Sequence, residues 1–229
     1  MSSHASEPAH SRLAHHFADL EQQKDAARLG MWIFLATEVM FFGGAIMAFA
    51  IYRSMFAPAF RAASDLQNVP LGTVNTVILL CSSLTMALAV HAAEGRHRAA
   101  LVRFLLLTIV LGTVFLGVKS IEYTHDYNEG LVPGASTFHP PAELVEEWKA
   151  HGIEARHVEL YFVFYFVMTG LHALHMIIGI AVLGIQAWMA RRGRFTDGYP
   201  TPIELTGLYW HFVDVVWIFL FPLLYLLRH

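Results

Sequence analysis

The sequence predicts an all-α, polytopic membrane protein, built as a bundle of five transmembrane helices. Of its 229 residues, 56% are apolar and only 14% are charged, whereas a soluble domain carries about 25% charged residues. Five apolar runs are long enough to cross a bilayer, since about 20 helical residues span its hydrocarbon core. The single cysteine, Cys81, excludes a disulfide framework or a cysteine metal cluster within one chain. The net charge of -3 gives no reason to expect a nucleic-acid partner.

The predicted organisation is a polar N-terminal tail, residues 1–28, followed by a transmembrane domain, residues 29–229. The tail is too polar for a secretory signal. Its second half, from Phe17 to Arg28, forms either an amphipathic helix on the membrane surface or part of a solvated leader. The expected spans are residues 29–52, 71–91, 101–121, 158–189 and 205–227.

The fourth span is about ten residues longer than a bilayer requires, so we expect it to tilt or protrude. The longest loop, residues 122–157, separates it from the third span. This loop contains three prolines and is expected to form a short amphipathic helix over Ala142–His151.

The basic residues predict a cytoplasmic N-terminus and a periplasmic C-terminus, because short cytoplasmic loops are enriched in Lys and Arg. Nine basic residues then lie on the cytoplasmic side: Arg12, Lys24, Arg28, Arg96, Arg98, Arg103, Arg191, Arg192 and Arg194. Five lie on the opposite side: Arg53, Arg61, Lys149, Arg156 and Arg228. The loop 122–157 is then external and acidic, with Glu122, Asp126, Glu129, Glu143, Glu146, Glu147 and Glu154.

The first span carries one carboxylate near its middle, Glu38. A charged carboxylate exposed to lipid at that depth is unfavourable, so Glu38 should face protein or water, or stay protonated. Phe34, Phe41 and Phe42 lie on the same side of the helix. Two interpretations remain open: a structural acid that hydrogen-bonds a neighbouring helix, or an element of proton handling.

Two later spans carry polar residues in pairs three positions apart. His172 and His175 share one face of the fourth span, and His211 and Asp214 share one face of the fifth. Histidines and carboxylates on facing helices can bind iron or zinc. Di-metal bundles need several carboxylates with Glu-x-x-His pairs, whereas Glu38 and Asp214 are the mid-span acids here.

The favoured interpretation is therefore an interhelical polar network with no metal. Its members are Asn75, His172, His175, His211 and Asp214, which would hydrogen-bond across the bundle. Haem ligation would need an axial histidine that faces a cavity, and the spacing favours no histidine for that role. Arg191 and Arg192 follow the fourth span and serve either topology or anionic-lipid binding.

Four runs of sequence are distinctive: residues 29–42, 70–80, 166–179 and 209–217. The last, Tyr209-Trp-His-Phe-Val-Asp-Val-Val-Trp217, is the most specific. Together they resemble subunit III of haem–copper cytochrome c oxidase, in its five-helix bacterial form. The resemblance covers nearly the whole chain from Leu29 onward.

The resemblance implies an accessory subunit rather than a catalyst. In that family subunit III binds no haem or copper; subunit I holds the oxygen-reducing centre and subunit II receives electrons. Subunit III packs beside subunit I, helps to keep the centre intact during turnover and supports proton uptake. The family's membrane-buried carboxylate corresponds to Glu38 in this sequence. The family also binds phospholipid, so the resemblance makes Arg191 and Arg192 candidate head-group ligands. Other residues match family positions: Asn75, His172, His175, Trp210, His211 and Asp214.

Two departures from the family's seven-helix form are apparent. This sequence has no counterpart of the first two helices of the seven-helix form, as in the five-helix bacterial forms. Its loop 122–157 is longer than the corresponding loop of the seven-helix form. The length and acidity of this loop suggest a contact with an outer-side partner, such as another respiratory complex or a cytochrome domain.

The predicted function is an accessory subunit of a proton-pumping terminal oxidase in the bacterial plasma membrane. That oxidase reduces oxygen to water, and Thr37-Glu38-Val39 favours cytochrome c as the electron donor. The alternatives are subunit III of a quinol oxidase and the subunit-III-like partner of a nitric oxide reductase. From other classes, the chain could be a stand-alone proton carrier built around Glu38 or an assembly factor.

Overall fold

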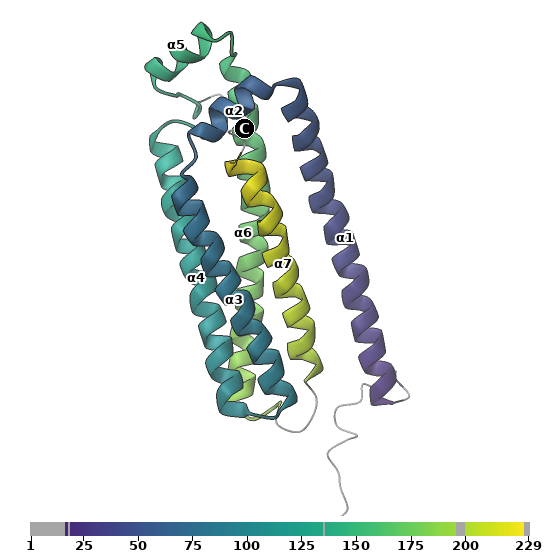
Figure 1. Ribbon diagram of the computed structural model, residues 1–229. Helices are drawn as coiled ribbons and strands as arrows, with labels where there is room; N and C mark the ends of the chain where they lie inside the picture. Colours follow the sequence, from purple (N-terminus) through teal and green to yellow (C-terminus); the bar gives the residue numbers. More distant parts are fainter. Residues whose placement is uncertain (1–16, 18, 135, 196–199, 227–229) are drawn as a thin grey trace, which may run out of the picture. The chain divides into compact units, whose positions relative to one another are not determined.

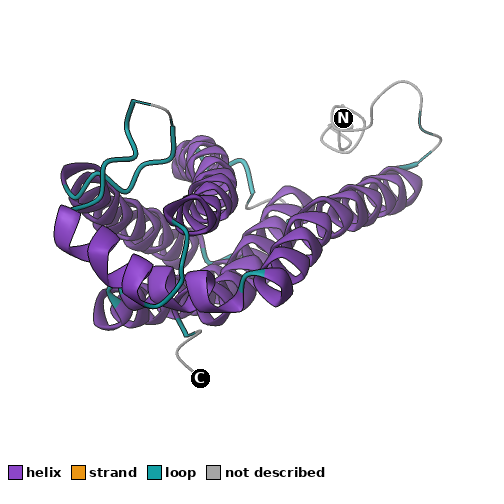
Figure 2. Cartoon of the chain, turned by 90° about the horizontal axis from the view of Figure 1, so that it is seen from above, coloured by secondary structure: helices purple, strands orange, loops and turns teal. Residues whose placement is uncertain are grey.

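The computed structural model describes residues 17, 19–134, 136–195 and 200–226, which form seven α-helices (Figure 1). The helices are α1 (Leu20–Met55), α2 (Ala57–Asp65), α3 (Val69–Glu94), α4 (Arg98–Asn128), α5 (Ala142–Ala150), α6 (Ala155–Arg191) and α7 (Thr201–Tyr225). The described residues include no strand (Figure 2). One isolated β-bridge among them joins Leu131 to Phe138. The all-α prediction is confirmed.

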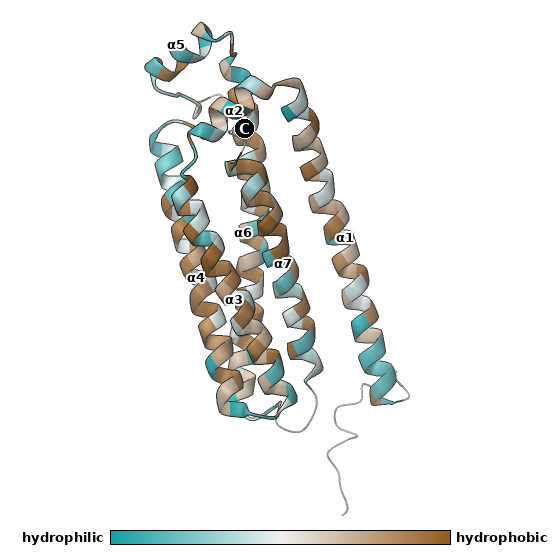
Figure 3. Ribbon diagram, viewed as in Figure 1, coloured by the Kyte–Doolittle hydropathy of each residue, from teal (hydrophilic) through white to brown (hydrophobic). Residues whose placement is uncertain are grey.

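Five of these helices, α1, α3, α4, α6 and α7, are long and apolar enough to cross a membrane. Their middle turns are hydrophobic, and the polar residues gather toward their ends and in α2 and α5 (Figure 3). The five-span prediction is therefore confirmed, and the orientation of the termini stays a prediction. The helix expected over Ala142–His151 is present as α5.

Helix α2 was not predicted, because the stretch from Arg53 to Pro70 reads as a polar connection. Its first turn contains Pro58, whose fixed φ suits the first turn of a helix. Ala59, Phe60 and Ala63 form its buried face. A proline followed by apolar residues at helical spacing was the available signal.

The chain divides into two compact units, residues 1–40 and residues 41–229, and the boundary lies within α1. In the first unit α1 begins with Asp19, whose Oδ1 accepts a hydrogen bond from the backbone N–H of Gln22 at 2.7 Å. This is the usual geometry of a helix N-cap. Later in this unit, Thr37 donates to the carbonyl of Phe34 at 2.7 Å, within the same helix as Glu38.

In the second unit α3, α4, α6 and α7 pack in a ring: α3 contacts α4 and α7, and α6 contacts the same two helices. Trp210 of α7 is fully buried and joins three of them. A Cβ atom at Gly112 of α4 or Gly179 of α6 would lie 2.9 Å from its indole. The indole N–H donates to Ser82 Oγ of α3 at 3.0 Å. Glycine is required at both positions because the indole occupies the space of a side chain.

The end of α7 lies at the same end of the second unit as α2 (Figure 1). The last carbonyls of a helix lack partners within the helix. Two buried side chains supply them here: Ser64 Oγ and Tyr161 O–H donate to the carbonyl of Leu224, at 3.0 Å and 2.6 Å. The C-terminal turn of α7 is thus fixed to both α2 and α6.

Candidate functional site

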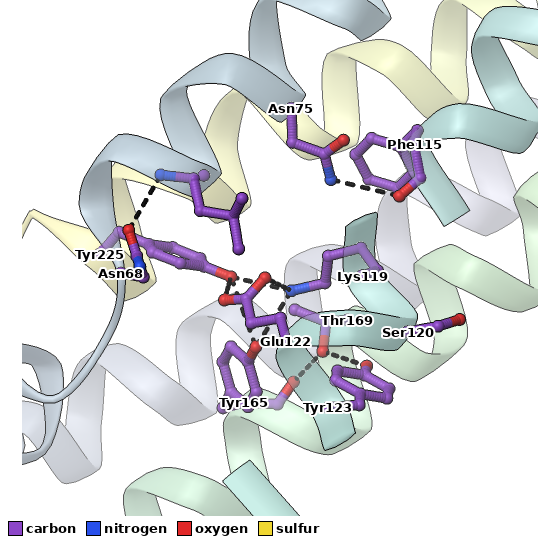
Figure 4. A network of polar contacts seen from close by, with 12 residues as sticks. Asn68, Asn75, Phe115, Lys119, Ser120, Glu122, Tyr123, Tyr165, Thr169 and Tyr225 are labelled. Carbon is purple, nitrogen blue, oxygen red and sulfur yellow. Dashed lines mark hydrogen bonds and ion pairs between the residues drawn. The ribbon is translucent and has the colours of Figure 1, made fainter. Parts of the chain in front are cut away.

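A buried ion pair lies between α4, α6 and α7 (Figure 4). Lys119 and Glu122 are one turn apart on α4, and Lys119 Nζ lies 3.0 Å from Glu122 Oε2. The two residues are only 3% and 4% exposed. Charged residues are almost never buried to this extent unless they are paired.

Two tyrosines complete the hydrogen bonding of this pair. Lys119 Nζ donates to Tyr165 O–H at 3.0 Å and to Tyr225 O–H at 2.8 Å, in addition to Glu122. Tyr225 O–H in turn donates to Glu122 Oε1. All three ammonium protons therefore have an acceptor, and both carboxylate oxygens have a donor.

The ammonium group also faces aromatic rings, which are favourable neighbours for a cation. It lies 4.9 Å from the ring centroid of Tyr165 and 5.2 Å from that of Trp217. We name Lys119, Glu122, Tyr165 and Tyr225 the Lys119 cluster. A charge pair satisfied in this way ties α4 to α6 and α7, because removal of any member takes a hydrogen-bond partner from a buried polar group.

Two further polar groups lie close to the Lys119 cluster. Tyr123 O–H and Thr169 Oγ1 are 2.6 Å apart and join α4 to α6 again. Asp126, one turn beyond Glu122, is 3% exposed. Its Oδ2 has no hydrogen-bond partner among the described residues.

The Lys119 cluster was not predicted from the sequence, and Glu122 and Asp126 were expected in the acidic outer loop. That assignment is corrected, since α4 continues to Asn128 and both acids are buried. The error arose because the apolar run stops at Ile121, while the helix continues for two further turns. The spacing of Lys119, Glu122 and Asp126, on one helical face, was the signal that could have revealed the cluster.

Three of the five residues of the predicted polar network have hydrogen-bond contacts with groups outside it. His211 Nδ1 lies 2.8 Å from Ser83 Oγ, which links α7 to α3. Asn75 Nδ2 donates to the carbonyl of Phe115 at 3.4 Å, which links α3 to α4. His175 Nδ1 faces the carbonyl of Leu171 on its own helix, at 2.8 Å.

His172 and Asp214 are buried without such links. The ring of His172 lies edge-on to Phe115 and beside Trp217, with centroids 5.4 Å and 5.1 Å apart. Neither ring nitrogen of His172 and neither carboxyl oxygen of Asp214 has a hydrogen-bond partner in the part of the chain that the structure describes. The interhelical hydrogen bonds of Asn75 and His211 thus go to Phe115 and Ser83 rather than to another member of the predicted network.

The remaining predicted residues lie on α1 and at the end of α6. Glu38 is on α1, in the first unit. Arg191 and Arg192 are exposed, and the guanidinium of Arg192 lies 3.8 Å from the ring centroid of Trp188. Arg98 donates to the carbonyls of Ala190 and Arg191 and so fixes this end of α6. Lipid binding by the two arginines stays a prediction.

The bond between Ser83 and His211 allows a first test of these contacts. Ser83→Ala is expected to lower the free energy of unfolding by about 1 kcal/mol, since it removes one interhelical hydrogen bond. The matched control is Ser120→Ala, because Ser120 Oγ donates to the carbonyl of Leu116 on its own helix. Denaturant unfolding in detergent measures both variants. Equal effects would show that the contact with His211 contributes nothing.

The fold and these contacts define an integral membrane bundle whose polar side chains join helices. Within the described ranges, no group of three His, Cys, Asp or Glu residues could hold a metal ion. The family model for cytochrome c oxidase subunit III matches residues 12–128 and 157–228. The chain belongs to this family, the subunit III proteins of haem–copper oxidases, and the predicted resemblance is confirmed.

The similar proteins are all named as oxidase subunit 3, but their names give two different electron donors, cytochrome c and quinol. Quinol oxidase subunit 3 of Bacillus spizizenii is 32% identical over 214 residues, which cover 92% of this chain and 93% of the relative. Cytochrome c oxidase subunit 3 of Corynebacterium diphtheriae is 32% identical over 205 residues, 87% of each chain. A probable cytochrome c oxidase subunit 3 of Rickettsia bellii is 30% identical over 227 residues, 90% of this chain and 70% of the relative. The chain is thus a subunit of a respiratory oxidase complex.

Proposed function

We propose that this chain is a non-catalytic subunit that packs beside subunit I of a proton-pumping terminal oxidase, together with subunit II. The complex reduces oxygen to water in the bacterial plasma membrane, with the N-terminus of this chain in the cytoplasm. Family membership and the five apolar helices support this assignment. The excess of basic residues in the short loops of one side supports the orientation.

The Lys119 cluster is the observation that carries the non-catalytic role. Its charged groups bond to one another and to two tyrosines, and so serve the packing of helices. The ring of His172 is likewise enclosed by Phe115 and Trp217. We propose that the partner subunits bind haem and copper and that this chain contributes no ligand.

The electron donor has two candidates. We propose cytochrome c, because the Thr37-Glu38-Val39 context resembles the cytochrome c oxidases and the Corynebacterium relative is named as one. Quinol is the second candidate, because the Bacillus relative is named as a quinol oxidase subunit at the same identity.

One preparation tests both proposals. The tagged chain is purified in mild detergent, and a reduced-minus-oxidised visible spectrum is recorded. We expect haem bands in the co-purified subunits and oxygen consumption with reduced cytochrome c. Oxygen consumption with quinol but not with cytochrome c would show that quinol is the electron donor. A colourless protein without partners would contradict the accessory role and favour a stand-alone carrier.

We also propose that Glu38 supports proton uptake by the complex. Glu38→Gln is expected to leave haem content and subunit composition unchanged, because the amide keeps the size of the side chain. Proton uptake during oxygen reduction, measured with a pH-sensitive dye, is expected to slow. Glu21→Gln is the control, since Glu21 lies in the first turn of the same helix. Loss of the subunit from the Glu38→Gln complex would indicate a structural acid instead.

A further inference from the structure

A groove of about 300 Å³ lies between α2 and α5, in the second unit. Its apolar lining comes from Ala62 and Leu66 on one side and from Leu144, Trp148 and Ile153 on the other. This volume is at the lower limit of small-molecule sites, which occupy about 300–1,000 Å³. The groove therefore suits a few side chains rather than a whole helix.

Helix α5 gives the groove one apolar and one acidic edge. Leu144 and Trp148 are one turn apart and face inward, and Trp148 is buried. Glu143, Glu146 and Glu147 are exposed, and Glu147 lies one turn from Leu144 and lines the groove with it. Helix α5 is thus amphipathic, with acids beside the apolar lining.

The charges around the groove are mainly negative. Glu147 lines it, and Glu143 lies one turn earlier on the same helix. Glu146 is paired with Lys149 at 3.0 Å, so its charge is offset. Arg61 and Asp65 of α2 also line the groove, as does His151 after α5. Three carboxylates, those of Asp65, Glu143 and Glu147, therefore surround the groove with Arg61 as the basic side chain of its lining.

The segment that carries α5 is a folded addition to the family bundle. The family match stops at residue 128 and resumes at residue 157, so α5 lies in the unmatched part. The backbone N–H of Gly134 donates to Glu159 of α6 at 3.0 Å. The N–H of Ile153 donates to the carbonyl of Trp148 at 2.8 Å, which closes the C-terminal end of α5. These bonds hold one edge of the groove in a defined conformation.

We infer that the groove docks a basic amphipathic segment of a partner protein, on the side of the membrane where α2 and α5 lie. An apolar side chain of the segment enters beside Leu144 and Trp148, and its Lys or Arg residues face Glu143 and Glu147. Charge complementarity favours this occupant over an acidic protein, because like charges at an interface are unfavourable. The inference rests on the proposed function as an accessory subunit of a terminal oxidase, which brings the chain close to such partners.

Photo-crosslinking in native membranes tests the inference. A benzophenone amino acid is introduced at Leu144 in the full chain, with Ala150, exposed on α5, as the comparison position. We expect Leu144 to crosslink to a peptide of net positive charge in another protein. Crosslinks only to lipid, to a second copy of this chain or to a neutral or acidic peptide would overturn the inference.

Charge reversal shows whether the acids act in docking. Glu143→Lys with Glu147→Lys is expected to lower the crosslink yield about tenfold, equivalent to about 1.4 kcal/mol. The matched control is Glu129→Lys with Glu154→Lys, which are exposed acids of the same segment outside the lining of the groove. An unchanged yield after the first pair of substitutions, or an equal loss after the control pair, would contradict the inference.

The same membranes separate this inference from the proposed function. Haem bands and oxygen consumption of the co-purified complex are recorded for every variant. If these are normal and no basic peptide is crosslinked, the docking site is wrong and the accessory role stands. If no haem protein co-purifies with the unmodified chain, the proposed function fails independently of the groove.

Discussion

Lys119→Met is expected to lower the free energy of unfolding by about 3–5 kcal/mol, the usual cost of removing one partner from a buried ion pair. The substitution leaves the carboxylate of Glu122 buried, with Tyr225 as its one remaining donor among the described residues. It also removes one hydrogen-bond donor from Tyr165 and from Tyr225. Thermal or denaturant unfolding of the purified complex measures the loss.

Two comparison variants show whether the charge is responsible. Lys119→Met combined with Glu122→Gln should be less destabilising than the sum of the two single effects, because no unpaired charge remains. Lys149→Met removes the exposed pair with Glu146 and should cost less than about 1 kcal/mol. Similar losses for Lys119→Met and Lys149→Met would contradict the role given to the buried cluster.

Trp210→Ala is expected to destabilise the bundle by about 3–5 kcal/mol, as for other large side chains removed from a core. The indole is fully buried and contacts Gly112 and Gly179, and its N–H bonds to Ser82. The truncation therefore leaves a cavity between three helices and an unpaired hydroxyl. Unfolding in detergent, with helicity followed by circular dichroism, measures the effect.

A pair of glycines on α6 provides the matched control. Gly179→Ala places a Cβ atom 2.9 Å from the indole and should cost about 1–3 kcal/mol by overpacking. At Gly184 on the same helix the added Cβ meets no atom within 4 Å. Gly184→Ala should therefore be neutral or slightly stabilising, since Ala favours helix more than Gly does. A tolerated Gly179→Ala would show that the helices separate without penalty.

The spans could be predicted from the sequence because a bilayer imposes a minimum apolar length on each helix. The same criterion of apolar length could not reveal the Lys119 cluster. A window of apolar residues ends where charges begin, yet α4 continues through Lys119, Glu122 and Asp126 because they are satisfied or enclosed by neighbouring helices. Contacts with Tyr165 and Tyr225, distant in sequence, cannot be inferred from local spacing.

The polar residues within the spans show the same limit. The sequence placed His172 and Asp214 on helical faces correctly but could not identify their neighbours. His172 lies among aromatic rings, whereas His211 lies beside Ser83. Such pairings depend on the rotation of each helix about its axis, which packing around Trp210 determines. Residue type and periodicity gave the candidates, and tertiary packing decides their partners.

The most direct test of the account is the oxidase complex purified from cells that lack this chain. We predict that subunits I and II retain their haem bands and copper content and begin oxygen reduction at a rate close to that of the complete complex. Activity should then decline faster over repeated turnovers, as expected for an accessory subunit that protects the centre. Loss of haem or copper from an otherwise assembled complex, or no activity from the first turnover, would contradict the account.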